Sequence, residues 1–220
     1  MKRFFIFLMI TLFSLSSIKA NAANYYGTAN NNASELDGVF FRATIQDMDA
    51  QWDNSNYRFV LHTCWLPTDS NTSWIEVGFL DGEWIGDHTY YRGFYAAQYI
   101  MDQNGNIQQR NLKKISGPST QVGTTHTFQI QRDGNNTWGV YIDYTLRQTW
   151  TSGTGSVGFS PHVGLESNNI VSTSSTWNER AFQIYKNGTW LNWSDAILSQ
   201  SGNASVNWDD EPTSIFSSQN

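Results

Sequence analysis

Hydrophobic residues in this chain gather in short runs rather than in a helical pattern. From Gly38 onward the runs are dense in β-branched and aromatic residues, and each is bounded by Gly, Asn, Asp or Pro. Such runs are typical of strands, and helical periodicity competes with them only weakly, around residues 193–198. Strands are therefore expected near residues 38–46, 57–65, 73–80, 92–101, 125–132, 137–144, 156–166 and 180–186.

Turn sequences between the runs indicate antiparallel pairing. Residues 102–106 (Asp-Gln-Asn-Gly-Asn) and 133–136 (Asp-Gly-Asn-Asn) tolerate positive φ angles, so each segment can reverse the chain. Residues 125–144 are accordingly expected to form one hairpin. Many antiparallel strands at this spacing predict an all-β fold, an antiparallel β-sandwich of the jelly-roll type.

The first 22 residues have the features of a secretory signal. Lys2 and Arg3 precede an apolar run at residues 4–10, and small residues lead up to Ala22. We expect cleavage after Ala22 and an exported protein, either secreted or periplasmic. The apolar run is short and soon interrupted by serines, which disfavours a membrane anchor.

About 198 residues follow the signal, enough for one domain. Residues 23–198 are expected to form a single β-sandwich, whose polar first segment, residues 24–37, is a surface lead-in or an irregular edge. Residues 199–220 are polar, acidic and short of apolar residues. They predict a loosely held or flexible tail.

The charge of the exported chain argues against two classes of partner. The sequence has 13 basic and 19 acidic residues, and removing the signal takes away Lys2, Arg3 and Lys19 but no acid, which leaves a net charge of about −9. Such a surface repels phosphate backbones and anionic lipids. We therefore expect no nucleic-acid partner and, once the signal is cleaved, no membrane partner.

Cysteine and histidine patterns predict no metal site. Cys64 is the only cysteine and lies in an apolar run, which favours a buried small hydrophobe over a reactive nucleophile. His62, His88, His126 and His162 lack metal-ligand spacing. The chain also has no Gly-x-Ser-x-Gly elbow, phosphate loop or dinucleotide fingerprint. No metal or organic cofactor is expected.

Two glutamates on strands are the candidate chemical groups. Alternation along residues 73–79 puts Glu76 on the face opposite the apolar residues, together with Trp74 and Gly78. The same argument puts Glu166 on the outer face of its own strand, beside Gly164. Each glycine could leave room for a ligand. Alternatively, both glutamates are ordinary solvent-facing strand residues.

The order of the motifs resembles the neprosin family of glutamic peptidases. The run Trp74–Phe79 is followed by Gly-Asp at 86–87 and by an aromatic strand that contains Gln98 and Tyr99. In that family an Ile-Glu-Ala-Gly-Trp strand precedes a Gly-Asp loop and a Tyr-Trp strand, and fungal-type glutamic peptidases have a related Leu-Gln-x-Gly strand. Residues 163–169 are similar to the family's Gly-Gly-Glu-x-x-Asn segment, and the resemblance extends over about residues 73–185.

The resemblance implies a concanavalin A-like sandwich of two seven-stranded sheets, with the active site on the concave face of one sheet. It implies that Glu76 and Glu166 are the catalytic pair of a secreted endopeptidase that cleaves polypeptides at acidic pH without a cofactor. Gln98 and Tyr99 would lie in the substrate groove. An exposed Trp74 beside Glu76 would also mark a groove, with Tyr95 and Tyr99 as further substrate-binding residues. Alternatively, Tyr95 and Tyr99 pack under a loop or against the opposite sheet.

Two other interpretations remain open. Sheets lined with aromatic and acidic residues also bind glycans, so Glu76 and Glu166 could belong to a lectin or to a glycosidase. The chain could also be a non-catalytic envelope module in which both glutamates are incidental. The separation of the two carboxyls would weaken both catalytic interpretations if it were too large for one shared water.

Overall fold

The computed structural model describes residues 25–50, 52, 57–68, 73–134, 136–151, 155–168, 175–193, 196–201, 206–209 and 211–215. The expected signal, residues 1–22, lies outside this part of the chain. The described residues form fifteen strands, and none of their segments is a helix long and apolar enough to cross a membrane.

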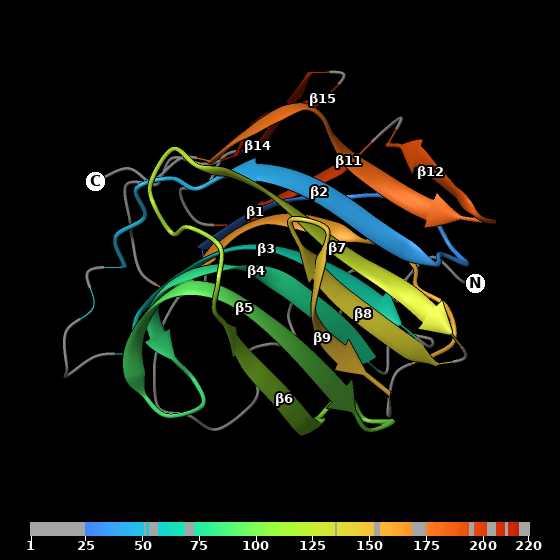
Figure 1. The fold of residues 1–220 in the computed structure, drawn as a ribbon, viewed down its shortest axis with the longest axis horizontal. Coiled ribbons are helices and arrows are strands. Elements are labelled where there is room, and N and C mark those ends of the chain that lie inside the picture. Colours follow the sequence, from blue (N-terminus) through green and yellow to red (C-terminus); the bar gives the residue numbers. More distant parts are fainter. Residues whose placement is uncertain are drawn as a thin grey trace.

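One sheet has seven strands, all of whose neighbouring pairs are antiparallel, in the order β13-β1-β10-β3-β4-β5-β6. Its long strands β4 and β5 are bent along their length (Figure 1). The strands are β1 (Tyr25–Asn30), β3 (Phe59–Thr68), β4 (Ser73–Trp84), β5 (Thr89–Met101), β6 (Ile107–Ile115), β10 (His162–Ser167) and β13 (Ile197–Ser201).

The other sheet has eight strands in the order β14-β15-β11-β2-β7-β8-β9, with β12 paired to β11 off this path. The two sheets lie one over the other (Figure 1), which confirms the all-β antiparallel sandwich. The strands are β2 (Gly38–Thr44), β7 (Thr125–Gly134), β8 (Thr137–Ile142), β9 (Thr145–Trp150), β11 (Ser175–Lys186), β12 (Thr189–Asn192), β14 (Val206–Asp209) and β15 (Glu211–Ile215).

Aromatic rings from both sheets fill the space between them. Phe41 stacks on Phe128 at 4.5 Å within the eight-stranded sheet. Phe94 of the other sheet reaches across to Phe128 at 5.8 Å and meets Phe79 at 5.3 Å. Cys64 is fully buried in the same core, as its apolar surroundings predicted, and burial raises the pKa of its thiol. These rings bury the apolar area that holds the sandwich together.

The expected turn at residues 102–106 forms as its residues predict. The carboxylate of Asp102 accepts hydrogen bonds from the backbone amides of Asn104 at 2.8 Å and Asn106 at 2.9 Å, which fixes the turn between β5 and β6. Strands β7 and β8 pair as the expected hairpin. The eight predicted strand positions all hold strands, although β10 begins at His162 and not near residue 156.

The sequence pattern missed several strands. Strand β6 carries Gln108, Gln109, Arg110, Lys113 and Lys114, so it lacks the apolar density of a central strand. It lies at the edge of its sheet, where a polar, basic strand is stable and resists pairing with other chains. Strands β13, β14 and β15 occupy the region expected to end the domain and form a loose tail. The sheets have seven and eight strands, where the resemblance implied seven in each.

Candidate active site

Glu76 and Glu166 lie on the same face of the seven-stranded sheet, the face turned away from the other sheet. Their neighbours along each strand, such as Val77 and Leu165, point into the core instead. Strand β3 separates the two glutamate strands. Glu76 is level with Trp65 of β3, whereas Glu166 is level with Leu61, four residues further along that strand. The two glutamates are therefore placed diagonally across β3, with backbones about 16 Å apart by ordinary strand spacing, so their side chains must converge over Thr63 for one substrate to contact both. We call this surface the outer face.

Thr63 of β3 lies between the two glutamates, level with Gly78 on one side and Gly164 on the other. A Cβ atom at Gly78 would come within 2.8 Å of the Thr63 Cα, and one at Gly164 would come within 2.8 Å of the Thr28 Cα. Both contacts are too close for a real side chain. The glycines are needed because neighbouring strands approach closely there, so the expectation that they simply leave room for a ligand is incomplete.

Glu76 is buried among aromatic side chains. It is only 6% exposed, so it is not an ordinary solvent-facing strand residue. The Trp74 indole donates a hydrogen bond to Oε1 at 2.8 Å, and the Tyr95 hydroxyl lies 3.4 Å from Oε2. Burial raises the pKa of Glu76 to about 8; hydrogen bonds from Trp74 and Trp65 oppose this shift, and the charge of Glu166 adds to it.

Glu166 is half-buried, and the same physical cause acts on it. Desolvation raises the pKa of its carboxyl to about 7. A buried carboxyl is costly to ionise, and a second negative charge nearby adds to that cost. Burial is the main cause of both raised pKa values; the charge of Glu166 adds to the shift of Glu76, whereas burial alone raises the pKa of Glu166.

The structure brings three of the four predicted substrate-binding residues together with Glu76. Trp74 stacks on Tyr99 with ring centroids 4.5 Å apart, and Tyr95 lies level with Gly78 on the outer face. Trp74 is only 6% exposed, so the expectation of an exposed tryptophan was wrong, although it does lie beside Glu76. Tyr95 and Tyr99 line the outer face and do not pack against the opposite sheet.

Gln98 is not part of this group. It is level with Ile75 on the opposite face of β5 from Tyr99, is 1% exposed and accepts a hydrogen bond from Asn111 at 2.6 Å. Strand alternation alone requires this, because Gln98 and Tyr99 are adjacent residues.

Sequence reasoning missed Tyr57 and Arg110. Tyr57 comes just before β3, and Arg110 is on edge strand β6, level with Tyr99. Burial raises the pKa of Tyr57, the charges of Glu83, Glu166 and Glu76 also raise it, and that of Arg110 lowers it. Tyr57 and Arg110 lie toward opposite ends of the strands, so their long side chains must extend over the outer face for one charge to act on the other, and a curved sheet favours this. The bent strands in Figure 1 agree with a concave outer face.

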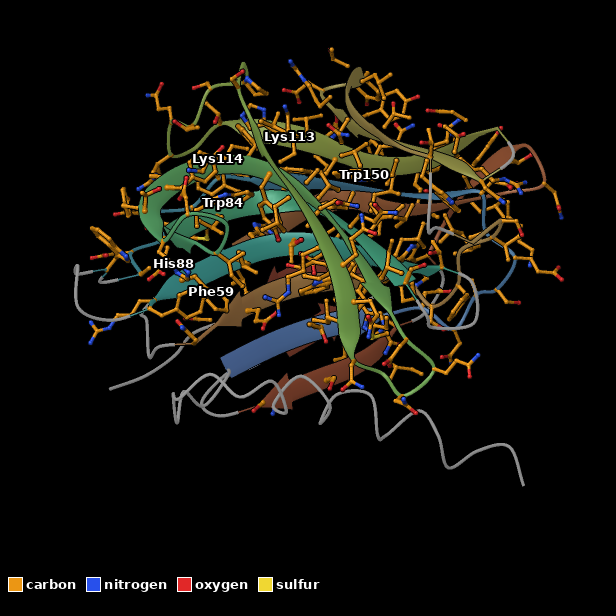
Figure 2. All side chains as sticks on the ribbon, turned by 90° about the horizontal axis from the view of Figure 1, so that it is seen from below. Phe59, Trp84, His88, Lys113, Lys114 and Trp150 are labelled. Atoms are coloured by element: carbon orange, nitrogen blue, oxygen red, sulfur yellow. The ribbon has the colours of Figure 1, made fainter. Side chains whose placement is uncertain are left out.

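One end of the outer face is closed by contacts from the β4–β5 hairpin. Lys114 of β6 lies over Trp84, with its Nζ atom 5.5 Å from the ring centroid, and forms an ion pair with Asp87 at 3.0 Å. Figure 2 shows Trp84 and Lys114 close together at this end.

Trp65 was also missed by the sequence analysis. It lies level with both Glu76 and His162, and a single tryptophan in an apolar run carries no signal of its own.

The outer face offers groups for proton chemistry. No group of three or more metal-ligating side chains occurs among the described residues. Burial lowers the pKa of His162 to about 4, so this imidazole next to Trp65 is neutral at most pH values. A pair of carboxyls that shares a proton can supply an acid and a base at once.

Comparisons with known proteins identify the fold. No protein-family model matches the chain, and no curated protein does. A solved structure of scytalido-glutamic peptidase with a transition-state analogue inhibitor matches with a TM-score of 0.57 and 12% identity, over 88% of this chain and 96% of that chain. A second structure of that peptidase, with a peptide-based transition-state analogue, matches with a TM-score of 0.56 and 12% identity, over 87% and 96%.

SCP-B, a member of the eqolisin family of peptidases solved with the tripeptide Ala-Ile-His, matches with a TM-score of 0.52 and 12% identity, over 87% of this chain and 96% of that chain. At such low identity the similarity establishes the fold alone. The chain has a glutamic peptidase-like β-sandwich.

Proposed function

We propose that this chain is an exported glutamic endopeptidase, similar to the neprosin family, in which Glu76 and Glu166 activate water to hydrolyse peptide bonds. The observation that carries the proposal is that both carboxyls lie on the outer face with pKa values raised by burial, and that the charge of Glu166 acts on Glu76 across β3. The resemblance of the motifs around both glutamates and the shared sandwich fold support it.

The environments of the two carboxyls suggest different roles. Glu166 is the more exposed of the two carboxyls, so it ionises more readily and acts as the general base that takes a proton from water. Glu76 keeps its proton longer, polarises the scissile carbonyl and later protonates the leaving amine. Trp74 and Tyr95 hold the Glu76 carboxyl in place, Tyr99 stacks on Trp74, and an extended polypeptide would bind beside these rings.

The pH range of activity follows from the number of protons on the pair. The mechanism needs one ionised and one protonated carboxyl. The pKa values of about 7 and 8 put that state nearer to neutral pH than the acidic range implied by the resemblance. An assay must therefore cover both ranges.

The test is cleavage of a mixed denatured-protein substrate by the exported chain between pH 3 and 9. Glu166→Gln should abolish cleavage because an amide cannot act as a base. Glu76→Leu should abolish it as well. Glu76→Gln is informative in a different way: fungal-type enzymes carry Gln on the related strand, so this variant should keep weak activity, because an amide can still donate a hydrogen bond to the carbonyl.

Glu35→Gln is the matched control, because Glu35 is an exposed glutamate outside the outer face. It should cleave like the parent protein. A folded parent protein that cleaves nothing at any pH would reject the proposal, as would full activity in folded Glu166→Gln.

A further inference from the structure

A strip of aromatic rings crosses the opposite side of the molecule, on the face of the eight-stranded sheet that is turned away from the core. Tyr144 stacks on Phe40 at 6.2 Å, Phe40 meets Trp190 edge to face at 6.1 Å, and Trp190 stacks on Tyr185 at 4.9 Å. These four residues come from the β8–β9 turn and from strands β2, β12 and β11. Phe40 is only 8% exposed and supports the other three rings, which are the ones that a ligand can reach. We call them the aromatic strip.

Carboxamide side chains lie beside the aromatic strip on the same face. Gln129 and Gln183 are level with Phe40 on its two neighbouring strands, and Gln131 is level with Gly38, next in line on β2. Gln129 donates to Gln131 at 2.6 Å, and Gln183 donates to Asn192 at 2.9 Å. Each pair orients its amides and still has donor and acceptor atoms outside that bond.

Charged side chains flank this arrangement rather than interrupt it. Along β2 and β7 the alternation that brings Phe40 and Gln129 to this face also brings Arg42 at one end and Asp133 at the other. The Asp133 carboxylate accepts a hydrogen bond from Tyr141 at 2.8 Å. The middle of the face is therefore made of rings and neutral amides.

Tyr144 is the least expected member of the strip. It is 68% exposed and has a φ angle of 59°, in the left-handed region where glycine or asparagine is the favoured residue. The turn is held rigidly, because the Asp143 carboxylate accepts a hydrogen bond from the Thr127 amide at 3.1 Å and lies 2.8 Å from His126 Nδ1. Folding gains little from a tyrosine that is both strained and exposed, which suggests a binding role.

We propose that the aromatic strip and its amides bind a neutral polysaccharide chain. Aromatic faces pack against the apolar C–H faces of sugar rings, and carboxamides both donate and accept hydrogen bonds, as sugar hydroxyls do. The lack of charge in the middle of the face disfavours phosphorylated or acidic ligands. Amides interleaved with the rings also distinguish this face from the apolar centre of a protein–protein interface.

This site is separate from the glutamates. The whole core lies between the two faces, so a polysaccharide on the aromatic strip leaves the outer face of the seven-stranded sheet open. The site would hold the protein on a polysaccharide surface, and the inference does not depend on what Glu76 and Glu166 do.

The test uses insoluble cellulose, chitin and a panel of neutral β-glucan, mannan and xylan hexasaccharides as probes for the exported chain. We expect binding to at least one of them, weakened about tenfold or more by Trp190→Ala and severalfold by Tyr144→Asn. Asparagine suits the left-handed turn, so Tyr144→Asn removes the ring without threatening the fold. Leu191→Ala is the matched control: Leu191 is next to Trp190 on β12, points to the other side of the strand and is 46% exposed.

The same experiment separates this proposal from its rivals. No binding to any probe would overturn it. Binding that is unchanged in Trp190→Ala and Tyr144→Asn but lost in Glu76→Gln would also overturn it, and would move the sugar to the glutamates. A concentration-dependent dimer that Trp190→Ala dissociates, without sugar binding, would show that the strip contacts a second copy of the chain.

Discussion

The Trp74 indole donates a 2.8 Å hydrogen bond to the carboxyl of Glu76, two residues along the same strand. Both side chains point to the same face because two residues complete one strand repeat. The bond matters because Glu76 is buried, and a hydrogen bond to the ionised form stabilises that form. It therefore acts against the desolvation that raises the pKa of Glu76. This relationship makes the proton affinity of Glu76 testable by mutation.

Replacing Trp74 with Phe should raise the pKa of Glu76 further. Phenylalanine keeps a ring against Tyr99 but loses the indole donor. A hydrogen bond to a charged group is worth roughly 1.5–3 kcal/mol, and one pKa unit corresponds to about 1.4 kcal/mol, so we expect an upward shift of roughly one to two units. Titration of the Glu76 carboxyl carbon by NMR measures it directly.

Tyr95→Phe is the comparison for that experiment. The Tyr95 hydroxyl is 3.4 Å from the other carboxyl oxygen, so its bond is weaker than that of Trp74. Its removal should give a smaller upward shift. A downward shift in either variant, or a larger one in Tyr95→Phe, would mean that the indole bond does not govern the proton affinity of Glu76.

The stability of the fold should decline as the pH rises toward 8. Glu76 has a pKa of about 8 in the folded protein against 4.5 ordinarily, and Glu166 one of about 7. Both groups bind protons more tightly when folded, so their contribution is fully present below about pH 4.5. It is lost progressively as the pH rises from about 4.5 to 7 for Glu166 and to 8 for Glu76, with a slope of about 1.4 kcal/mol per pH unit for one group. Urea unfolding at pH 5, 6, 7 and 8 measures this slope.

Glu76→Gln should reduce the decline, because glutamine does not titrate. Buried His62 has the opposite effect at lower pH: burial lowers its pKa to about 3, so its contribution is lost as the pH falls from 6.5 toward 3. His162, whose pKa burial lowers to about 4, acts in the same direction as His62. Between about pH 4.5 and 6.5 the two histidines therefore offset the two carboxyls, and stability should decline on either side of that range. A decline above pH 7 that is equally steep in the parent protein and in Glu76→Gln would rule out Glu76 as its source.

The sequence predicted the sandwich well because its central strands are also its most apolar segments. The runs around Phe41, Phe79 and Phe128 carry alternating large side chains that can only be buried between two sheets. Edge strands have no such requirement. Strand β6 is polar because one of its edges and much of its surface face solvent, so its sequence looks like a loop.

Within the candidate site, only those residues whose placement strand alternation decides could be predicted. Alternation alone placed Glu76 with Trp74. The same argument could have excluded Gln98 from the substrate-binding residues, because Gln98 is adjacent to Tyr99 and must face the other way. Tyr57 and Arg110 could not be predicted, because they reach the site through the curvature of the sheet rather than through strand register. Trp65 needed the pairing of β3 with β4, a long-range contact that no local pattern specifies.

Gly78→Ala should destabilise the fold strongly. The added methyl group would meet the backbone of β3 near Thr63, where neither partner can move without disrupting the sheet. Overpacking of this kind costs about 1–3 kcal/mol and sometimes more, and thermal unfolding should show a lower midpoint. Gly134→Ala is the control, because a Cβ atom there meets nothing within 4 Å; equal losses in both variants would contradict the close-approach argument.

Arg110 should select peptides with an acidic side chain, if the chain is the peptidase that we propose. Arg110 is exposed on β6, level with Tyr99, and its charge lowers the pKa of Tyr99 against the effect of burial. Within the described part of the chain its guanidinium has no ion pair, so it can pair with a carboxylate of the substrate. Arg110→Gln should lower kcat/KM about three- to tenfold for peptides that carry Asp or Glu near the cleaved bond and leave kcat/KM for neutral peptides nearly unchanged.

Lys113→Gln provides the control, since Lys113 is an exposed cation on the same strand that points to the other face. Equal losses for acidic and neutral peptides would assign Arg110 a structural role instead, because only a direct charge contact distinguishes the two substrates.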